Sequence, residues 1–413
     1  MDFSKEIILL AEEAEKALEE VFKEIDRVAF KNTEKVMDAF RESRVSDSFF
    51  AGTSGYGYDD RGREALDEVF ATVFEAPKGL VRHTIANGTA AISAALYALL
   101  RPGDTLLSVT GKPYDTLEEV VGIKGERGNG SLADFGVNYK EIPLKDGKVD
   151  LEAVEKALDD SVKVVFLQRS KGYLARPTLS SAEIGEVTAF VKARCSAYVV
   201  VDNCYGEFCE EKEPTAYGVD IAVGSLIKNP GGGMALSGGY FVGTERAIEL
   251  VSYRLTSVGV GAEVGATLGQ NRDLFKGIFY APHTVAQALK TAALAAYMFE
   301  KLGYEVSPRY NEPRYDIIQT VVCGSREKLC SFCQGIQKGS PIDSFVTPEP
   351  WDMPGYSDQV IMAAGAFVQG ASIELSADGP MREPYIAFFQ GGLTYESGKY
   401  GIMCAAEKVG KKE

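Results

Sequence analysis

The chain has 413 residues, 45% of them hydrophobic, which is enough to bury the cores of one large domain and a smaller one. Its 44 Lys and Arg residues against 59 Asp and Glu residues leave a formal net charge of -15, which argues against nucleic acid as a partner because acidic chains repel phosphate backbones. No apolar run is long enough to span a bilayer and no signal-peptide pattern is present, so we expect a cytoplasmic protein without membrane contact.

The N-terminal 45 residues are predicted to form amphipathic helices. Charges are interleaved there with apolar residues at helical spacing, namely Ile7, Leu10, Ala14, Leu18, Val21, Phe22, Ile25 and Val28. The next segment, 46–63, is rich in Gly, Ser and Asp and is predicted to be a loop. We therefore expect an N-terminal helical segment over residues 1–50.

Residues 64–250 alternate helical patterns with short apolar strands. The clearest strands are 106–110, 162–168, 197–202, 221–225 and 238–243. Near-continuous β-branched runs are typical of strands buried on both faces, so the sequence predicts an α/β fold with a mostly parallel, doubly wound sheet. Beyond residue 250 the chain is Gly-rich, is helical from about 282, and then mixes helix and strand. We expect a large domain over 51–290 and a smaller C-terminal α/β domain over 291–413.

The string Asn87-Gly88-Thr89-Ala90 opens a predicted helix. A helix N-terminus with Gly and Thr presents free N–H groups and a hydroxyl to an anion such as phosphate. Simple capping of the helix by Asn87 or Thr89 is the alternative interpretation.

Two polar residues follow strands of the predicted sheet. Asp202 ends the strand 197–202, and a buried carboxylate there needs a partner, such as a protonated pyridine nitrogen or a salt bridge. Lys228 follows the strand 221–225, with Ser225 three residues before it and three glycines after it. Burial lowers a lysine pKa and makes the amine nucleophilic, although an ordinary loop lysine is the alternative. Ligands bind outside the carboxyl ends of such strands, so Asp202 and Lys228 are predicted to face one crevice.

Seven cysteines are an odd number in a long chain, which argues against a disulfide framework. Cys330 and Cys333 form a lone C-x-x-C motif. A zinc site would need further ligands, and His83 and His283 lie far away in sequence. We therefore expect buried thiols here and no metal site.

The strand-end Asp, the later Ser-x-x-Lys and the upstream N-G-T-A helix start resemble fold-type-I enzymes that use pyridoxal 5'-phosphate (PLP). More closely, the chain resembles the methionine γ-lyase and cystathionine β-lyase branch, in the subgroup associated with aluminium resistance. The strings that carry this resemblance are FAGTSGYGYDDRGRE, HTIANGTAAISAAL, KPYDTLEEV, VVVDNCYGEF and GSLIKNPGGG. The resemblance covers nearly the whole chain and implies the fold and the cofactor.

The resemblance also implies roles for individual residues. Lys228 would hold PLP as a Schiff base, and Asp202 would pair with its pyridine nitrogen. Tyr114 would stack on the ring and act as an acid or base. The phosphate would be held by Gly88, Thr89, Ala90 and Ser225.

In the lyases a Tyr-x-Arg motif from a neighbouring subunit also binds the phosphate. The candidates here are Tyr56 or Tyr58 with Arg61, although neither tyrosine has the family's spacing to the arginine. A Gly-Tyr surface loop is the alternative interpretation. The resemblance therefore implies a homo-oligomer, a dimer or a tetramer, whose sites are shared between subunits.

A substrate α-carboxylate calls for a bidentate arginine. Arg382 lies in the C-terminal domain, where such an arginine falls in the family, and Arg169, which follows a strand, is its rival. Gln168 and Ser170 are expected to line the substrate site.

The function implied is that of a PLP-dependent carbon–sulfur lyase acting on a sulfur-containing amino acid by β- or γ-elimination, with a keto acid and ammonia as products. One alternative is another PLP enzyme of amino acids, an aminotransferase or an aldolase. A second is a regulatory protein with the PLP fold and no turnover.

Overall fold

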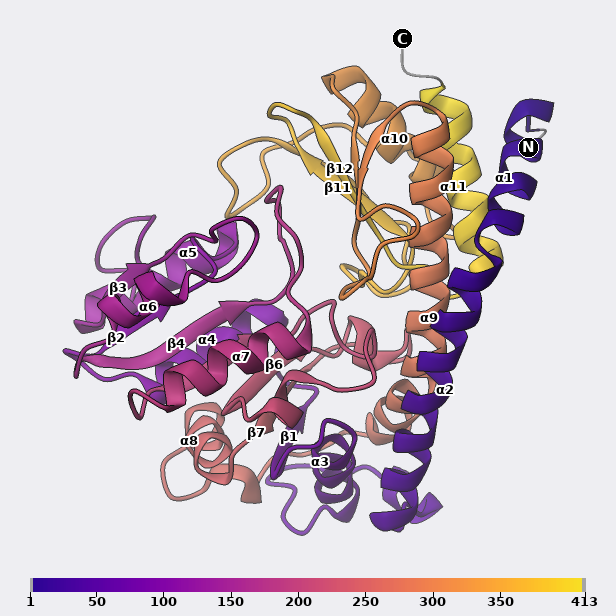
Figure 1. Cartoon of the computed structure of the whole chain (residues 1–413). Coiled ribbons are helices and arrows are strands. Elements are labelled where there is room, and N and C mark those ends of the chain that lie inside the picture. Colours follow the sequence, from indigo (N-terminus) through magenta and orange to yellow (C-terminus); the bar gives the residue numbers. More distant parts are fainter. Residues whose placement is uncertain (1–2, 411–413) are drawn as a thin grey trace.

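The computed structural model describes residues 3–410 and contains two sheets joined along one side by long helices (Figure 1). The helices are α1 (Lys5–Ala17), α2 (Glu19–Glu42), α3 (Arg61–Val73), α4 (Gly88–Leu99), α5 (Asp115–Val121), α6 (Leu151–Ala157), α7 (Ser181–Lys192), α8 (Glu245–Leu255), α9 (Asn271–Lys301), α10 (Arg326–Gly339) and α11 (Tyr395–Val409). The strands are β1 (Lys78–Arg82), β2 (Thr105–Ser108), β3 (Asn138–Glu141), β4 (Val162–Gln168), β5 (Tyr198–Asp202), β6 (Ile221–Ser225), β7 (Gly239–Gly243), β8 (Glu305–Ser307), β9 (Gln319–Val322), β10 (Val360–Ala363), β11 (Ser376–Pro380) and β12 (Ile386–Gln390).

The larger sheet has the strand order β1-β7-β6-β5-β4-β2-β3. All neighbouring strands are parallel except β7, which is antiparallel to both β1 and β6. Side chains of β4 alternate between two cores: Val164 and Phe166 pack with α4 and α8, whereas Val165 and Leu167 pack with α7. Helices therefore cover both faces, and the predicted α/β fold with a mostly parallel, doubly wound sheet is confirmed.

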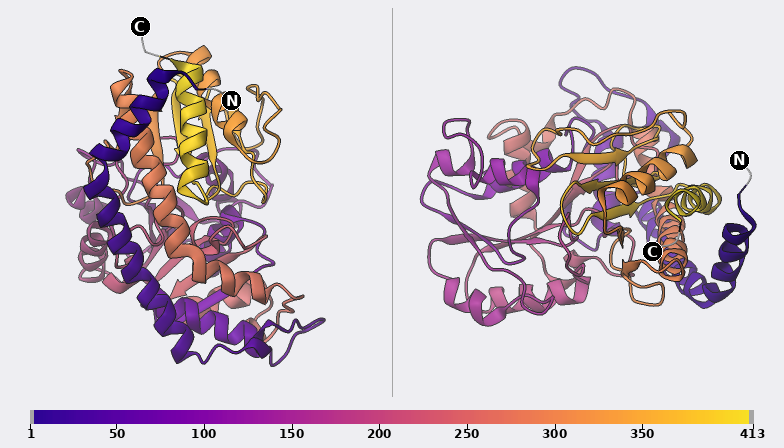
Figure 2. Two further views of the ribbon diagram at one scale, coloured as in Figure 1. Left: turned by 90° about the vertical axis from the view of Figure 1, so that its right-hand side faces the viewer. Right: turned by 90° about the horizontal axis from the view of Figure 1, so that it is seen from above.

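The smaller sheet is antiparallel, with the order β10-β11-β12-β9-β8. Helices α9, α10 and α11 and the N-terminal α1 share one hydrophobic core with it. Helix α9 also belongs to the core beside the large sheet, so it connects the two sheets. Figure 2 shows α2 running alongside α9, in agreement with the packing of these two helices.

Two local predictions need correction. Residues 46–63 are not loop throughout, since Asp47–Phe50 forms a 3-10 turn and α3 begins at Arg61. Helix α9 begins at Asn271 rather than near residue 282, and Pro282 lies inside it. The early turns of α9 include Gly277, where a Cβ atom would lie 2.6 Å from the carbonyl oxygen of Gly231. This glycine thus serves close packing of the loop that follows Lys228 and does not interrupt the helix.

Within residues 3–410 no helix combines the length and the apolar character needed to cross a membrane. The same part of the chain contains no group of three or more His, Cys, Asp or Glu side chains arranged to hold a metal ion. Cys330 and Cys333 lie on α10, where Cys333 is buried in the core and Cys330 is half-buried.

Candidate active site

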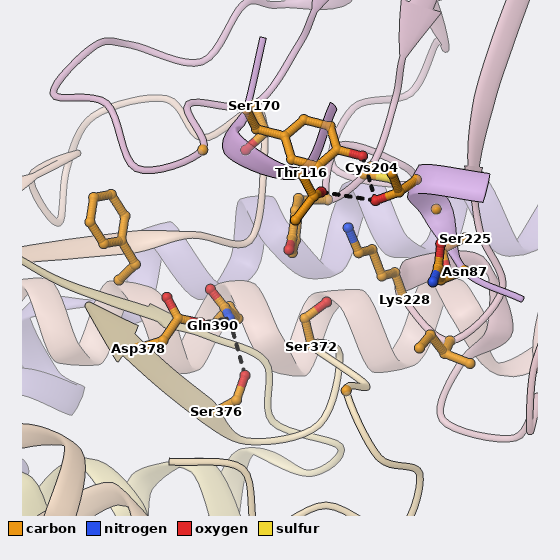
Figure 3. A pocket seen from close by; sticks show the side chains of 18 of the residues that line it. Asn87, Thr116, Ser170, Cys204, Ser225, Lys228, Ser372, Ser376, Asp378 and Gln390 are labelled. Carbon is orange, nitrogen blue, oxygen red and sulfur yellow. Dashed lines mark hydrogen bonds between the residues drawn. The ribbon is translucent and has the colours of Figure 1, made fainter. Parts of the chain in front are cut away.

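A cavity of about 500 Å³ lies between the carboxyl ends of β4, β5 and β6 and the strands β11 and β12 of the smaller sheet. Figure 3 shows Lys228, Ser225 and Asn87 on one side of it and Asp378, Gln390 and Ser376 on the other. The large sheet thus supplies one wall and the small sheet the opposite one.

Lys228 projects into this cavity from the loop after β6. Its Nζ atom lies 3.9 Å from the centroid of the Tyr205 ring. The turn after it depends on glycine, because Gly232 has a positive φ and a Cβ atom there would lie 2.5 Å from the carbonyl oxygen of Gly277. Lys228 is therefore placed by close packing of its loop on α9.

Burial lowers the pKa of the Lys228 ammonium, but Cys204, Tyr205 and Asp202 raise it, and the pKa stands above its ordinary range. The expectation that burial lowers the pKa of Lys228 is therefore wrong for the site as a whole. Of these three neighbours only Asp202 is a carboxylic acid, since burial raises the pKa values of Cys204 and Tyr205 and keeps the thiol and the phenol protonated at neutral pH. A cation bound at Asp202 would offset its effect on the lysine.

Asp202 is the last residue of β5, and β5 pairs with β6. The carboxyl group of Asp202 and the amine of Lys228 therefore come from the ends of adjacent strands. The backbone N–H of Cys204 donates to Oδ1 of Asp202 at 3.1 Å. Burial raises the pKa of this carboxyl, while Lys228 and the hydrogen bonds from Cys204 oppose that rise. Asp202 is thus a buried acid that a cationic partner would stabilise.

The N-terminus of α4 meets β6 beside Lys228. A Cβ atom on Gly88 would lie 3.5 Å from Cβ of Ser225 and 4.0 Å from Nζ of Lys228. The hydroxyl of Ser225 is buried and has no hydrogen-bond partner among the described residues. A hydroxyl without a partner beside a helix N-terminus fits the oxygens of a phosphate.

Ala90 does not reach the cavity. Its N–H donates to the side chain of Asn87 at 2.8 Å, so Asn87 caps the helix as the alternative interpretation proposed. Gly88 and Thr89 line the cavity. The anion site and the helix cap therefore coexist at the start of α4.

Tyr114 is held from two directions. Its hydroxyl donates to Oγ1 of Thr89 at 2.8 Å, and its backbone N–H donates to Oε1 of Gln168 at 2.9 Å. Burial and the charge of Asp202 raise the pKa of Tyr114. The side chain is therefore a neutral phenol, which can donate a proton but is a poor base.

Gln168 and Ser170 line the cavity, but their side chains are engaged elsewhere. Nε2 of Gln168 donates to the carbonyl oxygen of Ser170 at 3.0 Å, and the Ser170 hydroxyl donates to Asp316 at 2.8 Å. These contacts hold the loop and the backbone of Tyr114. A direct contact with substrate stays a prediction.

The two candidate arginines lie outside the cavity. Arg169 is fully buried and binds Asn203 at 2.7 Å and the carboxylate of Glu210, so it is not available to a substrate carboxylate. Arg382 is exposed, and its Nη1 lies 3.0 Å from Asp358. Among the described residues that line the cavity, Lys228 is the only Lys, Arg or His.

Tyr56 and Tyr58, in the loop before α3, and Arg61, the first residue of α3, also lie outside the cavity of their own chain. Tyr56 and Tyr58 are 74% and 58% exposed, and their rings stack 5.5 Å apart. Arg61 lies over the ring of Phe49 at 5.2 Å. A role at the site of a neighbouring copy stays a prediction.

Several cavity residues have no strong local signal in the sequence: Cys204, Tyr205, Tyr173, Tyr356, Ser372, Phe388 and Asp378. Tyr205 has a φ of 73°, a strained value for a residue with a side chain. Asp378 is an acid within a fully buried strand. Its burial depends on the docking of the two sheets, and the surrounding string SADGP gives no local sign of it.

A lysine after β6, an aspartate at the end of β5 and an anion cradle at the start of α4 define the fold-type-I class of PLP-dependent proteins. PLP is the cofactor that this fold implies, and the residues fit it. The unpartnered Ser225 hydroxyl suits its phosphate, and Asp202 suits its ring nitrogen.

Comparison with known proteins identifies the family. Residues 7–410 match the methionine gamma-lyase family, so the chain belongs to it. It is 51% identical to the uncharacterized protein YnbB of Bacillus subtilis over 405 residues, which are 98% of this chain and 96% of that protein. A Clostridium acetobutylicum protein, provisionally described as a cystathionine β-lyase involved in aluminium resistance, has a TM-score of 0.96 at 48% identity, with 98% and 96% of the two chains covered. The suspected subgroup is thereby confirmed.

A more distant solved structure shows the shared fold. The PLP-dependent protein YhfS of Escherichia coli has a TM-score of 0.62 at 15% identity, with 92% of this chain and 95% of that chain covered.

Replacing Ser225 with alanine is expected to weaken PLP binding roughly tenfold, because a hydrogen bond to a charged phosphate is lost. The same change removes a buried hydroxyl without a partner, so the melting temperature of the PLP-free protein should not fall. A fluorescence titration with PLP measures the first effect and calorimetry the second. Ser372→Ala is the matched control, since Ser372 is also an unpartnered cavity serine but comes from the segment between β10 and β11 and not from the end of β6. Equal losses in both variants would contradict the phosphate role.

Proposed function

We propose that this protein is a PLP-dependent carbon–sulfur lyase that acts on a sulfur-containing amino acid. The reaction is a β- or γ-elimination, and its products are a keto acid and ammonia. The proposal is carried by the grouping of Lys228, Asp202 and Ser225 around one cavity. Membership of the methionine gamma-lyase family supports this class of reaction.

The residues that would hold PLP follow from the site. Asp202 would be the counter-ion of the ring nitrogen, and Ser225 with the N-terminus of α4 would bind the phosphate. Once bound, PLP withdraws electrons from the α-carbon of an amino acid, which makes the α-proton removable. Tyr114 lies close enough to Asp202 for that charge to raise its pKa, so it borders the same space.

Lys228 is the group proposed to move protons. Its Nζ is the only amine among the described residues that line the cavity, so it is the base for the α-proton. In a γ-elimination the same atom would also serve as the proton shuttle at Cβ, while the sulfur leaves as a thiol. Neutralising Asp202 removes one cause of the raised Lys228 pKa, which favours the free amine that a base requires.

Tyr114 is proposed as the acid that serves the departing sulfur. Its raised pKa keeps the hydroxyl protonated, and Thr89 accepts its hydrogen bond and orients it. Gln168 fixes the backbone of Tyr114 from behind. This arrangement gives the phenol a defined direction into the cavity.

The direct test of the reaction is turnover by the PLP-loaded protein. Cystathionine, cystine, methionine and homocysteine are supplied separately, and ammonia and keto acid are measured. We expect release of both from at least one of these amino acids. No release from any of the four would remove the lyase assignment, while glutamate-dependent keto-acid exchange without ammonia would indicate an aminotransferase.

The proposal includes a homo-oligomer in which the loop with Tyr56, Tyr58 and Arg61 completes the phosphate site of a neighbouring copy. Two exposed, stacked tyrosines are unusual on a surface that faces only water. The loop is also held in place, because the N–H of Gly265 donates to the carbonyl oxygen of Tyr56 at 2.9 Å. An ordered, exposed aromatic loop suits contact with a second chain.

Arg61→Ala is expected to weaken PLP binding roughly tenfold, because one charge-assisted hydrogen bond to the phosphate is lost. Mixing Arg61→Ala with an inactive Lys228→Ala protein tests whether sites are shared. In a mixed oligomer, some sites would combine Lys228 of an Arg61→Ala chain with Arg61 of a Lys228→Ala chain. Activity should therefore rise above that of either variant alone. No gain after mixing, or an active monomer in sedimentation, would contradict the shared site.

A further inference from the structure

The wall of the cavity opposite Lys228 contains a second buried acid. Asp378 lies on β11, is 8% exposed and faces the cavity (Figure 3). Nε2 of Gln390 donates to its Oδ2 at 3.2 Å, and the hydroxyl of Tyr173 also hydrogen-bonds to it. None of the ion pairs within residues 3–410 includes Asp378. The basic group whose charge lowers the pKa of Asp378 is Lys228, on the other side of the cavity. Its charge is therefore solvated by hydrogen bonds but has no partner cation.

Aromatic rings surround this carboxylate. The ring centroid of Tyr173 lies 5.0 Å from that of Phe388 and 5.7 Å from that of Tyr356, and all three rings line the cavity. Burial raises the pKa values of both tyrosines, so their rings are neutral. Neutral aromatic faces beside a carboxylate are the surroundings that recognise an ammonium group.

The charges in the cavity point to the same kind of ligand. Three acids, Asp115, Asp202 and Asp378, face one lysine among the described residues that line it. Asp202 has a use in the proposed function as the partner of the PLP ring nitrogen. A buried carboxylate without a counter-ion is costly, and a cationic group of the substrate would offset that cost at Asp378.

We propose that Asp378, with the rings of Tyr173, Tyr356 and Phe388, binds an ammonium group at the far end of the substrate. The assignment rests on the proposed function, since it concerns the same cavity. It defines the substrate class as amino acids in which the sulfur that departs carries an aminoalkyl group. Methionine and homocysteine do not belong to this class.

A matched pair of substrates tests the proposal. S-(2-aminoethyl)-L-cysteine and S-propyl-L-cysteine have the same length and differ only in an ammonium or a methyl group at the end. The PLP-loaded protein is expected to cleave the first with a kcat/KM on the order of 30-fold higher, from a desolvated cation–π contact and a charge-assisted hydrogen bond. Equal kcat/KM values would overturn the ammonium subsite and leave the lyase function standing.

Variants identify the residues responsible. Asp378→Asn should remove the preference by lowering kcat/KM for the aminoethyl compound and leaving the propyl compound nearly unchanged. Tyr356 lies in a half-buried loop, and Tyr356→Leu should reduce the preference for the aminoethyl compound in part. This second variant tests the proposal if Asp378→Asn folds poorly. Asp343→Asn is the control, because this acid is exposed on the same domain. Retention of the full preference by both Asp378→Asn and Tyr356→Leu would overturn the proposal.

A binding measurement separates this inference from the lyase function. L-lysine and L-2-aminoheptanoic acid form an equivalent pair that has no sulfur to eliminate. Calorimetry with the PLP-loaded protein should show tighter binding of L-lysine, and Asp378→Asn should abolish the difference. That result without any cleavage of the two cysteine derivatives would refute the lyase and support the subsite. Equal binding of the two amino acids, or binding of neither, would refute the subsite.

The preference should also depend on pH. Burial raises the pKa of Asp378 to about 6, against hydrogen bonds from Tyr173 and Gln390 and the charge of Lys228. The titratable groups in electrostatic contact with it are Tyr173, Tyr205, Tyr356, Cys333 and Lys228, and all of these have raised pKa values. Asp378 is thus the member of this group that loses its charge near pH 6. Discrimination between the paired ligands should fall as the pH drops through that value, and a pH-independent preference would exclude Asp378 as its source.

Discussion

Replacing Lys228 with alanine is expected to lower kcat by at least about 10³-fold, the size of loss seen when an essential catalytic group is removed. The reason is structural, because no other amine among the described residues lines the cavity. The variant should also fail to attach PLP covalently. Wild-type protein mixed with PLP should gain a visible absorption band that borohydride bleaches, and digestion should then show the added mass on the peptide that contains Lys228.

Lys228→Arg is the matched control for charge. The guanidinium keeps a cation near Asp202 and Tyr205, but it cannot lose its proton at accessible pH. If the lysine acts through its amine, the arginine variant should be as inactive as the alanine variant. An active arginine variant would show that only the positive charge matters. A protein that stays colourless with PLP would refute the assignment of the cofactor itself.

Asp202→Asn is expected to produce the second largest loss, a fall in kcat/KM of roughly 100-fold. Breaking a buried ion pair with the PLP ring nitrogen costs about 3 kcal/mol, which corresponds to that factor. The amide keeps the shape of the side chain and can still accept the hydrogen bond from the backbone of Cys204. The fold should therefore persist, and circular dichroism with a thermal melt would verify it.

A cofactor analogue distinguishes the electrostatic role of Asp202 from a structural one. PLP methylated at the ring nitrogen carries a permanent positive charge and does not need an acid to hold a proton there. Activity of Asp202→Asn should rise with this analogue relative to ordinary PLP. An equal activity with both cofactors would indicate that Asp202 supports the fold and not the charge of the ring.

The central strands of the large sheet were predictable because burial on both faces selects long β-branched runs. β4 and β6 match the predicted ranges, and β5 begins one residue later than expected. The edge strands β1 and β3 escaped prediction, since the exposed residues of β3 and the Lys-Gly start of β1 lack that signature. The start of α9 was missed because the Gly-rich stretch after residue 250 was extended to about residue 282, whereas the helix begins at Asn271.

The candidate arginines show where local reasoning fails. Gln168 pairs in register with Asp202, and both side chains line the cavity. Successive side chains of a strand point to opposite faces, so the neighbouring Arg169 points away and is buried among Glu210 and Glu213. Its position after a strand was correct, but the direction of its side chain depended on the register of the sheet.

The sequence alone determined the large sheet, the placement of Lys228, Asp202 and Ser225 at its edge, and the family. It could do so because parallel strands bring their carboxyl ends to one edge, so residues after successive strands must meet there. Tertiary structure alone decided the opposite wall of the cavity. Asp378 and Phe388 come from an antiparallel sheet, and Tyr173 comes from the loop between β4 and α7. These residues come together only because α9 packs against both sheets and sets how one sheet lies against the other. No local sequence pattern encodes that arrangement.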